Sequence, residues 1–161
     1  MTLENSRLPA WRAVLYGALV VGAIDWLYAT LFVVSKGRPW YRPWQGVATS
    51  LLGPDAMNGG SATVLFGTLL HFTVAACIVT TYMVASRWLP ILREKILLSG
   101  LAFGVAAFFV MNLVVVPLTR IGPQPFHWSA WTLGGLLVHA LLLGPAAAFF
   151  AGRVPVRTNP T

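Results

Sequence analysis

The sequence predicts an all-α protein, a four-helix up-down-up-down transmembrane bundle with a short interfacial helix in its first loop. Of the 161 residues, 57% are hydrophobic and only 9% are charged, which is too little charge to cover the surface of a soluble domain. The apolar residues also gather into four blocks. Each block is close to the roughly 20 residues that an α-helix needs to cross a ~30 Å hydrocarbon core. We therefore expect residues 1–161 to form a single integral membrane domain.

The predicted spans cover residues 13–35, 62–86, 96–118 and 129–151. The first is not a cleaved signal peptide, because Asp25 interrupts a block that is longer than the apolar segment of such a peptide. The short connection between the second and third spans predicts that they are antiparallel neighbours. A bundle of four short helices leaves little room for a wide internal cavity, so a channel is expected between protomers.

The first loop, residues 36–61, is the longest connection and carries an aromatic and basic cluster. Residues 45–52 within it predict a short helix that lies in the membrane interface. Aromatic rings anchor in the headgroup layer, where guanidinium groups meet phosphates. The cluster consists of Arg38, Trp40, Tyr41, Arg42 and Trp44. Two interpretations are compatible with it: an aromatic belt that only anchors the protein in the membrane, and a specific binding site for a lipid or a partner.

The net charge of +7 comes from cations that flank the spans and form no continuous basic stripe, so nucleic acid is not an expected partner. Seven Lys and Arg residues belong to the termini and the middle loop, against four in the other two loops. The positive-inside rule then predicts that both termini are cytoplasmic. The seven are Arg7, Arg12, Arg87, Arg93, Lys95, Arg153 and Arg157, and the four are Lys36, Arg38, Arg42 and Arg120.

Each predicted span contains one strongly polar residue, and the four fall at similar depths. At ~1.5 Å per residue, Asp25 and His139 lie within about 2 Å of the midplane, His71 about 4 to 5 Å and Asn112 about 7 to 8 Å toward the outer face. An aspartate at a helix centre costs roughly 2.5 to 3.5 kcal/mol unless it finds a partner. We therefore expect Asp25, His71, Asn112 and His139 to form one buried polar cluster.

Three roles are compatible with this cluster. It can be a hydrogen-bonded network that fixes helix register, with Asp25 neutral or paired with a histidinium. It can be a path for a proton, an ion or a small solute, because a carboxyl group and two imidazoles at mid-bilayer can relay a proton. It can also hold a b-type haem through His71 and His139, although a haem protein that moves electrons across a bilayer usually needs a second histidine pair. No cofactor or metal is the simplest expectation.

The sequence contains no GxSxG, P-loop or HExxH motif, so an enzyme is not expected. We expect a non-enzymatic structural or accessory component of a membrane assembly, with transport as the alternative. The expected partners are the lipid bilayer and either other membrane subunits or a second copy in a homodimer. They would be contacted through the Trp-rich loop or through Phe108, Phe109, Phe149 and Phe150.

Several short segments resemble small uncharacterised bacterial inner-membrane proteins, including the YagU-like group. They are Gly-Ala-Ile-Asp at 22–25, Ser-Leu-Leu-Gly at 50–53, Leu-Leu-His-Phe at 69–72, Met-Asn-Leu-Val-Val-Val-Pro-Leu at 111–118 and Leu-Val-His at 137–139. The resemblance implies a multi-pass protein of the bacterial inner membrane. It points at the same four polar residues without naming their task, and some members of the group are linked to acid tolerance.

Overall fold

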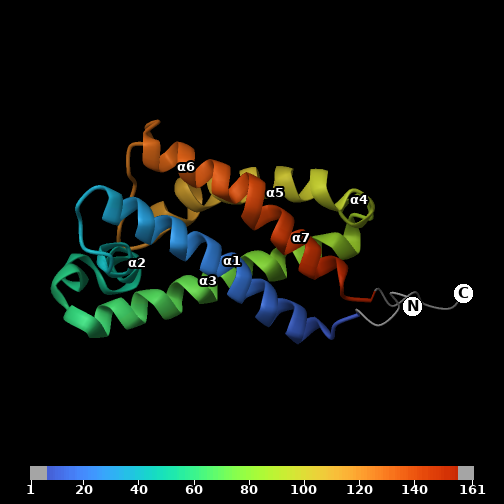
Figure 1. Cartoon of the computed structure of the whole chain (residues 1–161), viewed down its shortest axis with the longest axis horizontal. Coiled ribbons are helices and arrows are strands. Elements are labelled where there is room, and N and C mark those ends of the chain that lie inside the picture. Colours follow the sequence, from blue (N-terminus) through green and yellow to red (C-terminus); the bar gives the residue numbers. More distant parts are fainter. Residues whose placement is uncertain (1–6, 156–161) are drawn as a thin grey trace, which may run out of the picture.

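The computed structural model describes residues 7–155, and within this range the chain forms helices and no strand. Four long helical segments make up a bundle (Figure 1): α1 (Ala10–Ser35), α3 (Gly60–Trp88), a third span (Ile96–Leu118) and a fourth span (Ala130–Gly152). Each is long and apolar enough to cross a membrane. The predicted all-α four-helix transmembrane bundle is therefore confirmed, and the chain is a multi-pass membrane protein. Residues 1–6 and 156–161, with Arg157, lie outside the described range.

The third and fourth spans each contain a π-helical turn. Pro117 and Pro145 follow these turns closely and explain them, because a proline lacks an N–H and its ring collides with the carbonyl four residues earlier. The backbone widens just before each proline. The parts are α5 (Ile96–Val110), η3 (Met111–Val115) and η4 (Val116–Leu118) in the third span, and α6 (Ala130–Val138), η5 (His139–Leu143) and α7 (Gly144–Gly152) in the fourth.

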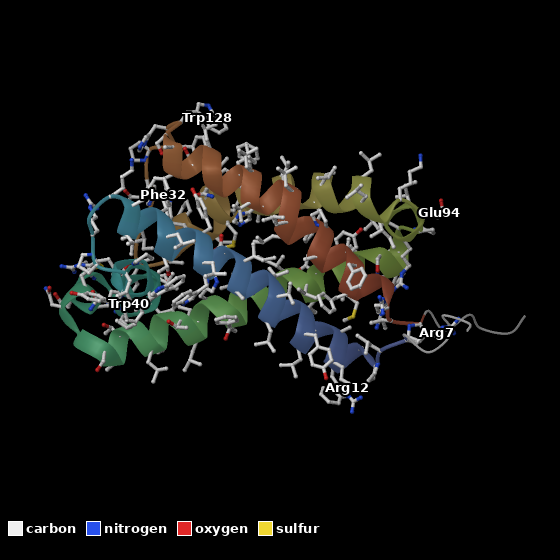
Figure 2. The ribbon with its side chains drawn as sticks, in the orientation of Figure 1. Arg7, Arg12, Phe32, Trp40, Glu94 and Trp128 are labelled. Atoms are coloured by element: carbon white, nitrogen blue, oxygen red, sulfur yellow. The ribbon has the colours of Figure 1, made fainter. Side chains whose placement is uncertain are left out.

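The first and last parts of the described chain meet at one end of the bundle. There the Leu8 amide donates to the carbonyl oxygen of Arg153 at 2.9 Å. Figure 2 labels Arg7, Arg12 and Glu94 at this end, which we call the terminal end. Phe32, Trp40 and Trp128 are labelled at the opposite end, which we call the loop end.

The fourth span packs against all three others, and its contact with α5 depends on glycines. A Cβ added at Gly104 would collide with the carbonyl oxygen of His139, and one added at Gly144 would collide with that of Gly100. Small residues thus bring the two backbones together, as expected for helices packed in lipid. The hydrophobic core fills the terminal half of the bundle and includes Ala13, Val21, Val79, Tyr82, Leu143 and Ala147.

The second and third spans meet near their connection, which contains the short helix α4 (Ile91–Glu94). There the hydroxyl groups of Tyr82 and Ser99 lie 2.7 Å apart, and the Tyr82 ring packs edge-on against Phe103. Toward the loop end, side chains of α3 and of η3 line a cavity between the spans. The second and third spans, which were predicted to be neighbours, are therefore in contact near the terminal end but are separated by a cavity toward the loop end.

The first loop forms the predicted short helix, α2 (Arg42–Leu52), followed by a 3-10 turn, η2 (Pro54–Asn58). Figure 1 shows α2 nearly end-on, so it runs across the loop end of the bundle. It docks on α3 at Gly67, where the Trp44 carbonyl oxygen lies so close that a Cβ would collide with it. Gln45 adds a hydrogen bond from its side-chain amide to the Gly60 carbonyl oxygen at 3.4 Å.

Two aromatic residues lie elsewhere than expected. Trp44 was expected in the headgroup layer, but its side chain is 1% exposed and stacks on Trp26 at a centroid distance of 5.0 Å. The docking of α2 on α3 turns this ring inward. Phe108 was expected on the outer surface, but it is buried and packs edge-on against His139.

Candidate functional site

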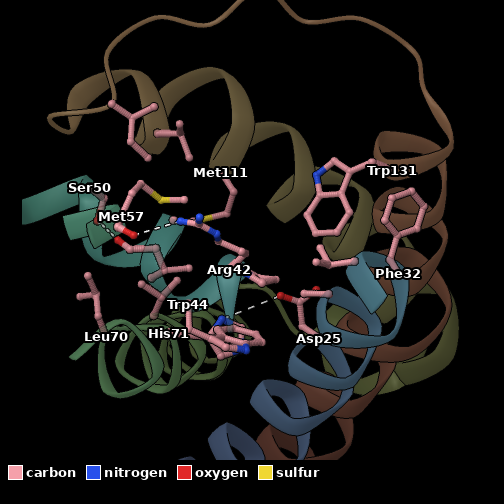
Figure 3. A pocket seen from close by; sticks show the side chains of 18 of the residues that line it. Asp25, Phe32, Arg42, Trp44, Ser50, Met57, Leu70, His71, Met111 and Trp131 are labelled. Carbon is pink, nitrogen blue, oxygen red and sulfur yellow. Dashed lines mark hydrogen bonds and ion pairs between the residues drawn. The ribbon is translucent and has the colours of Figure 1, made fainter. Parts of the chain in front are cut away.

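The candidate site is built around Asp25, near the middle of α1. Its carboxyl group lies between two imidazole rings: Oδ2 is 3.9 Å from Nδ1 of His71 on α3, and Oδ1 is 4.0 Å from Nδ1 of His139 in η5. Figure 3 shows the Asp25 and His71 side chains facing each other. These distances suit ion pairs and are longer than direct hydrogen bonds. The structure thus brings three of the four predicted polar residues together from three spans.

The ring of His71 is oriented by a backbone carbonyl. Its Nε2 lies 3.0 Å from the carbonyl oxygen of Gly22, and because a carbonyl only accepts, we assign a proton to Nε2. In the neutral ring, Nδ1 then directs a lone pair toward Asp25, which repels an ionised carboxylate. The pair is satisfied when it holds one further proton, either on Asp25 or on Nδ1 of His71.

The ring of His139 is oriented differently. Its Nδ1 lies 2.9 Å from the carbonyl oxygen of Gly135, so Nδ1 carries a proton even when the ring is neutral. The same nitrogen is the one that faces Asp25. Because this N–H is directed at the Gly135 carbonyl, the His139 ring lies 4.0 Å from Asp25 without donating a hydrogen bond to it. The two histidines are therefore oriented differently: Nδ1 of His71 is available to accept a proton, whereas Nδ1 of His139 is already bonded to the backbone.

Asn112, the fourth predicted residue, lies in η3. Its side-chain amide donates to the carbonyl oxygen of Phe108, one turn earlier, at 2.8 Å. Asn112 also lines a small cavity of about 220 Å³ together with Asp25, His71 and His139. We call this the inner cavity. Asn112 is therefore close to the other three residues but is bonded to its own helix.

A second cavity, of about 1410 Å³, extends from Asp25 and His71 toward the loop end. We call it the outer cavity. Its walls come from α1, α2, η2, α3 and the third and fourth spans and are mainly apolar, with Phe32, Val47, Met57, Leu70, Met111 and Trp131 among them. The expectation that four short helices leave little room for a wide cavity is wrong here, because α3 and η3 diverge and α2 covers the space between them. The cavity extends from Asp25 toward the loop end, while the packed core fills the terminal half.

Three cations line the outer cavity where it approaches the loop end: Lys36, Arg38 and Arg42. The salt bridges found within residues 7–155 that involve Asp25 are with the two histidines, and none of these three cations has a carboxylate partner in that range. Arg42 donates to the Met57 carbonyl oxygen at 3.0 Å, and Figure 3 shows it reaching into the cavity. This part of the cavity therefore favours anions.

The predicted aromatic and basic cluster is divided by the structure. Arg38, Arg42 and Trp44 belong to the wall of the outer cavity. Trp40 is 50% exposed at the loop end and packs edge-on against Tyr41, with centroids 6.0 Å apart. Trp40 and Tyr41 thus keep positions suited to the membrane interface.

Sequence reasoning overlooked Tyr28 and Trp131. The Tyr28 hydroxyl donates to the Trp131 carbonyl oxygen at 2.7 Å, the two rings stack at 5.4 Å, and both residues line the inner cavity. Tyr28 stands three residues after Asp25, so helical spacing places it on the same face of α1. That spacing was the available signal for Tyr28, whereas nothing in the sequence pairs it with Trp131.

The two histidines do not have the arrangement of axial haem ligands. A haem needs its two imidazoles on opposite sides of a flat macrocycle, whereas here the Asp25 carboxyl group lies within 4.0 Å of both rings. In the described part of the chain, no group of three or more His, Cys, Asp or Glu side chains could hold a metal ion.

No protein-family model, curated protein or solved structure matches the chain significantly. The resemblance to the YagU-like group stays a prediction. The function is therefore argued from the fold and the site.

Proposed function

We propose that this chain is a membrane transport protein in which Asp25 takes up and releases a proton as a small solute moves through the cavity. The position of Asp25 supports the proposal: it is a carboxyl group within a membrane span, flanked by two imidazoles, at the floor of a cavity of about 1410 Å³. Ionisable residues inside membrane spans are rare and mark proton or substrate pathways.

A structural or accessory role is the second candidate. It is favoured by exposed apolar side chains along the spans, such as Leu27, Leu31, Leu65 and Leu69, which can contact lipid or another subunit. A cluster that serves only to fix helix register needs to be enclosed, because protein interiors contain few voids larger than a water molecule. Fixing helix register does not by itself require the open space above Asp25, so transport ranks first.

The proposed proton step follows from the two histidine orientations. With one shared proton, Asp25 and His71 attract each other; when that proton leaves through the outer cavity, a lone pair of His71 faces a carboxylate. The pair then separates or accepts a new proton. Movement of a solute to the other side further needs the terminal half to open, and the widened turns η3 and η5 are where the third and fourth spans can bend.

The cation distribution supports an orientation. The terminal end carries Arg7, Arg12, Arg87, Arg93 and Lys95, so we propose that it faces the cytoplasm of a bacterial inner membrane. The outer cavity then lies toward the opposite side. This accords with the resemblance to inner-membrane proteins stated above.

Proton flux into proteoliposomes tests the proposal. The full chain is reconstituted around a trapped pH-sensitive dye, and a pH gradient drives proton entry. We expect flux above that of empty liposomes, and Asp25→Asn to lower the excess by at least about tenfold, because an amide cannot take up a proton. Asp55→Asn is the matched control, since Asp55 is exposed in the loop-end turn η2.

Flux that is equal for wild type and Asp25→Asn, both folded in the same lipid, would contradict the proposal. It would favour the structural role instead.

A further inference from the structure

We infer that the outer cavity binds an anionic amphiphile from the bilayer, a lipid with a phosphate headgroup at Lys36, Arg38 and Arg42 and an apolar chain in the cavity below. This inference names the class of ligand that the outer cavity takes up, an amphiphile in place of the small solute proposed above. It does not rest on proton exchange at Asp25. Size, lining and charge carry it.

The size and lining of the outer cavity suit an apolar chain. Its volume of about 1410 Å³ is larger than the roughly 300–1,000 Å³ of pockets for drug-sized ligands. Apolar side chains from several elements form most of its surface, including Phe32 from α1, Val47 from α2, Leu70 from α3 and Met111 from η3. A cavity of this kind between membrane spans takes up a hydrocarbon chain without removing it from apolar surroundings.

The charge of the cavity selects the headgroup. The three cations lie toward the loop end, where the headgroup layer meets the bundle, and within residues 7–155 none of them has a carboxylate partner. The one acidic residue of the lining, Asp25, lies at the floor beside His71. Positive charge above an apolar chamber complements a phosphate above an apolar chain. A cationic amphiphile would be repelled at the same place.

A buried donor in the wall also lacks a partner. Trp44 lines the outer cavity and is 1% exposed, and its Nε1–H has no hydrogen-bond acceptor in the protein. Buried donors are nearly always satisfied, because an unpaired one is costly. This donor is enclosed by protein, so it marks the wall of the cavity as incompletely satisfied and does not define a contact of the ligand. The lining and the charge identify the inferred ligand as an anionic phospholipid.

Native mass spectrometry tests the inference. The full chain in non-ionic detergent is titrated with phosphatidylglycerol and, separately, with phosphatidylcholine that has the same acyl chains. We expect a saturable one-to-one adduct that forms at lower concentration with phosphatidylglycerol. Lys36→Gln and Arg38→Gln should each weaken it about fivefold, which is about 1 kcal/mol per cation. Lys95→Gln and Arg87→Gln, which remove the same charges at the terminal end, should leave it unchanged.

A cavity-filling variant tests the place of the chain without changing charge. Gly46 lines the outer cavity on α2, and a Cβ added there meets nothing within 4 Å. The Gly46→Phe variant should therefore fold, and its affinity for phosphatidylglycerol should be at least tenfold lower. Val47→Trp serves as a second cavity-filling variant.

Equal affinity for the two lipids, or an equal loss in Lys36→Gln and Lys95→Gln, would overturn the inference. So would inorganic phosphate that displaces the adduct while both filling variants have no effect, because the site would then recognise free phosphate. The readout is binding, so its failure leaves the test of proton flux at Asp25 intact.

Discussion

At the scale of single residues, backbone carbonyl groups decide what the two histidines can do. The Gly22 carbonyl fixes the proton on Nε2 of His71, and the Gly135 carbonyl fixes the proton on Nδ1 of His139. Depth along the spans was enough to predict that both rings approach Asp25. The hydrogen-bonding roles of the individual ring nitrogens could not be predicted. They depend on how each ring is turned toward a backbone carbonyl, on another helix for His71 and on its own span for His139.

This difference predicts unequal effects of two matched variants. His71→Gln should abolish the Asp25-dependent flux, because the glutamine amide can still donate to the Gly22 carbonyl but cannot take up the shared proton. His139→Gln should lower it less, by about tenfold, because it removes a ring that lies 4.0 Å from the carboxyl group but forms no direct hydrogen bond to it. The measurement is proton entry into proteoliposomes across a range of external pH. Equal loss in both variants, or the larger loss in His139→Gln, would argue against these roles.

Trp44 shows where reasoning from single residues fails. An aromatic residue beside an arginine in a loop next to a span fits the interface and the interior equally well. Its inward position follows from Gly67, which lies on another helix and admits the Trp44 backbone. This pairing of two distant positions has no signature in the local pattern.

At the scale of elements, hydrophobic length predicted the four spans within a few residues of their ends. The first begins at Ala10 and the last ends at Gly152, against predicted limits of 13 and 151. Pro145 disturbs the helix of the fourth span, and the disturbance takes the form of the π-helical turn η5, which begins at His139. A proline in a span indicates that the helix is disturbed there, but not whether it kinks or widens. His139, which faces Asp25, is the first residue of this widened turn.

The docking of α2 gives a prediction for a single glycine. Gly67→Val should lower the free energy of unfolding by about 1–3 kcal/mol, because its Cβ collides with backbone that cannot move unless α2 shifts. Thermal unfolding in detergent measures the loss, and tryptophan fluorescence reports the exposure of Trp44. Gly46→Ala is the matched control, since its Cβ meets open space. If Gly67→Val unfolds like the wild type and leaves fluorescence unchanged, α2 is not docked in this way.

At the scale of the whole molecule, one half of the bundle is packed and the other is hollow. Composition predicted the membrane class, and span depth predicted the meeting of Asp25 with the two histidines. The cavities could not be predicted, because they result from the divergence of α3 and η3 and from the way α2 covers the space between them. The cytoplasmic placement of the termini and the bacterial inner membrane stay predictions, supported by the cation count and the resemblance.

Infrared difference spectroscopy between two pH values, on the protein in lipid, tests the central claim that Asp25 exchanges a proton at the cavity floor. Protonated carboxyl groups have a C=O stretching band of their own, which carboxylates lack. The account predicts a pH-dependent carboxyl band that is lost in Asp25→Asn, shifted in His71→Gln and retained in Lys95→Gln. A difference spectrum of Asp25→Asn that is identical to that of the wild type would show that Asp25 does not exchange a proton, and would contradict the account.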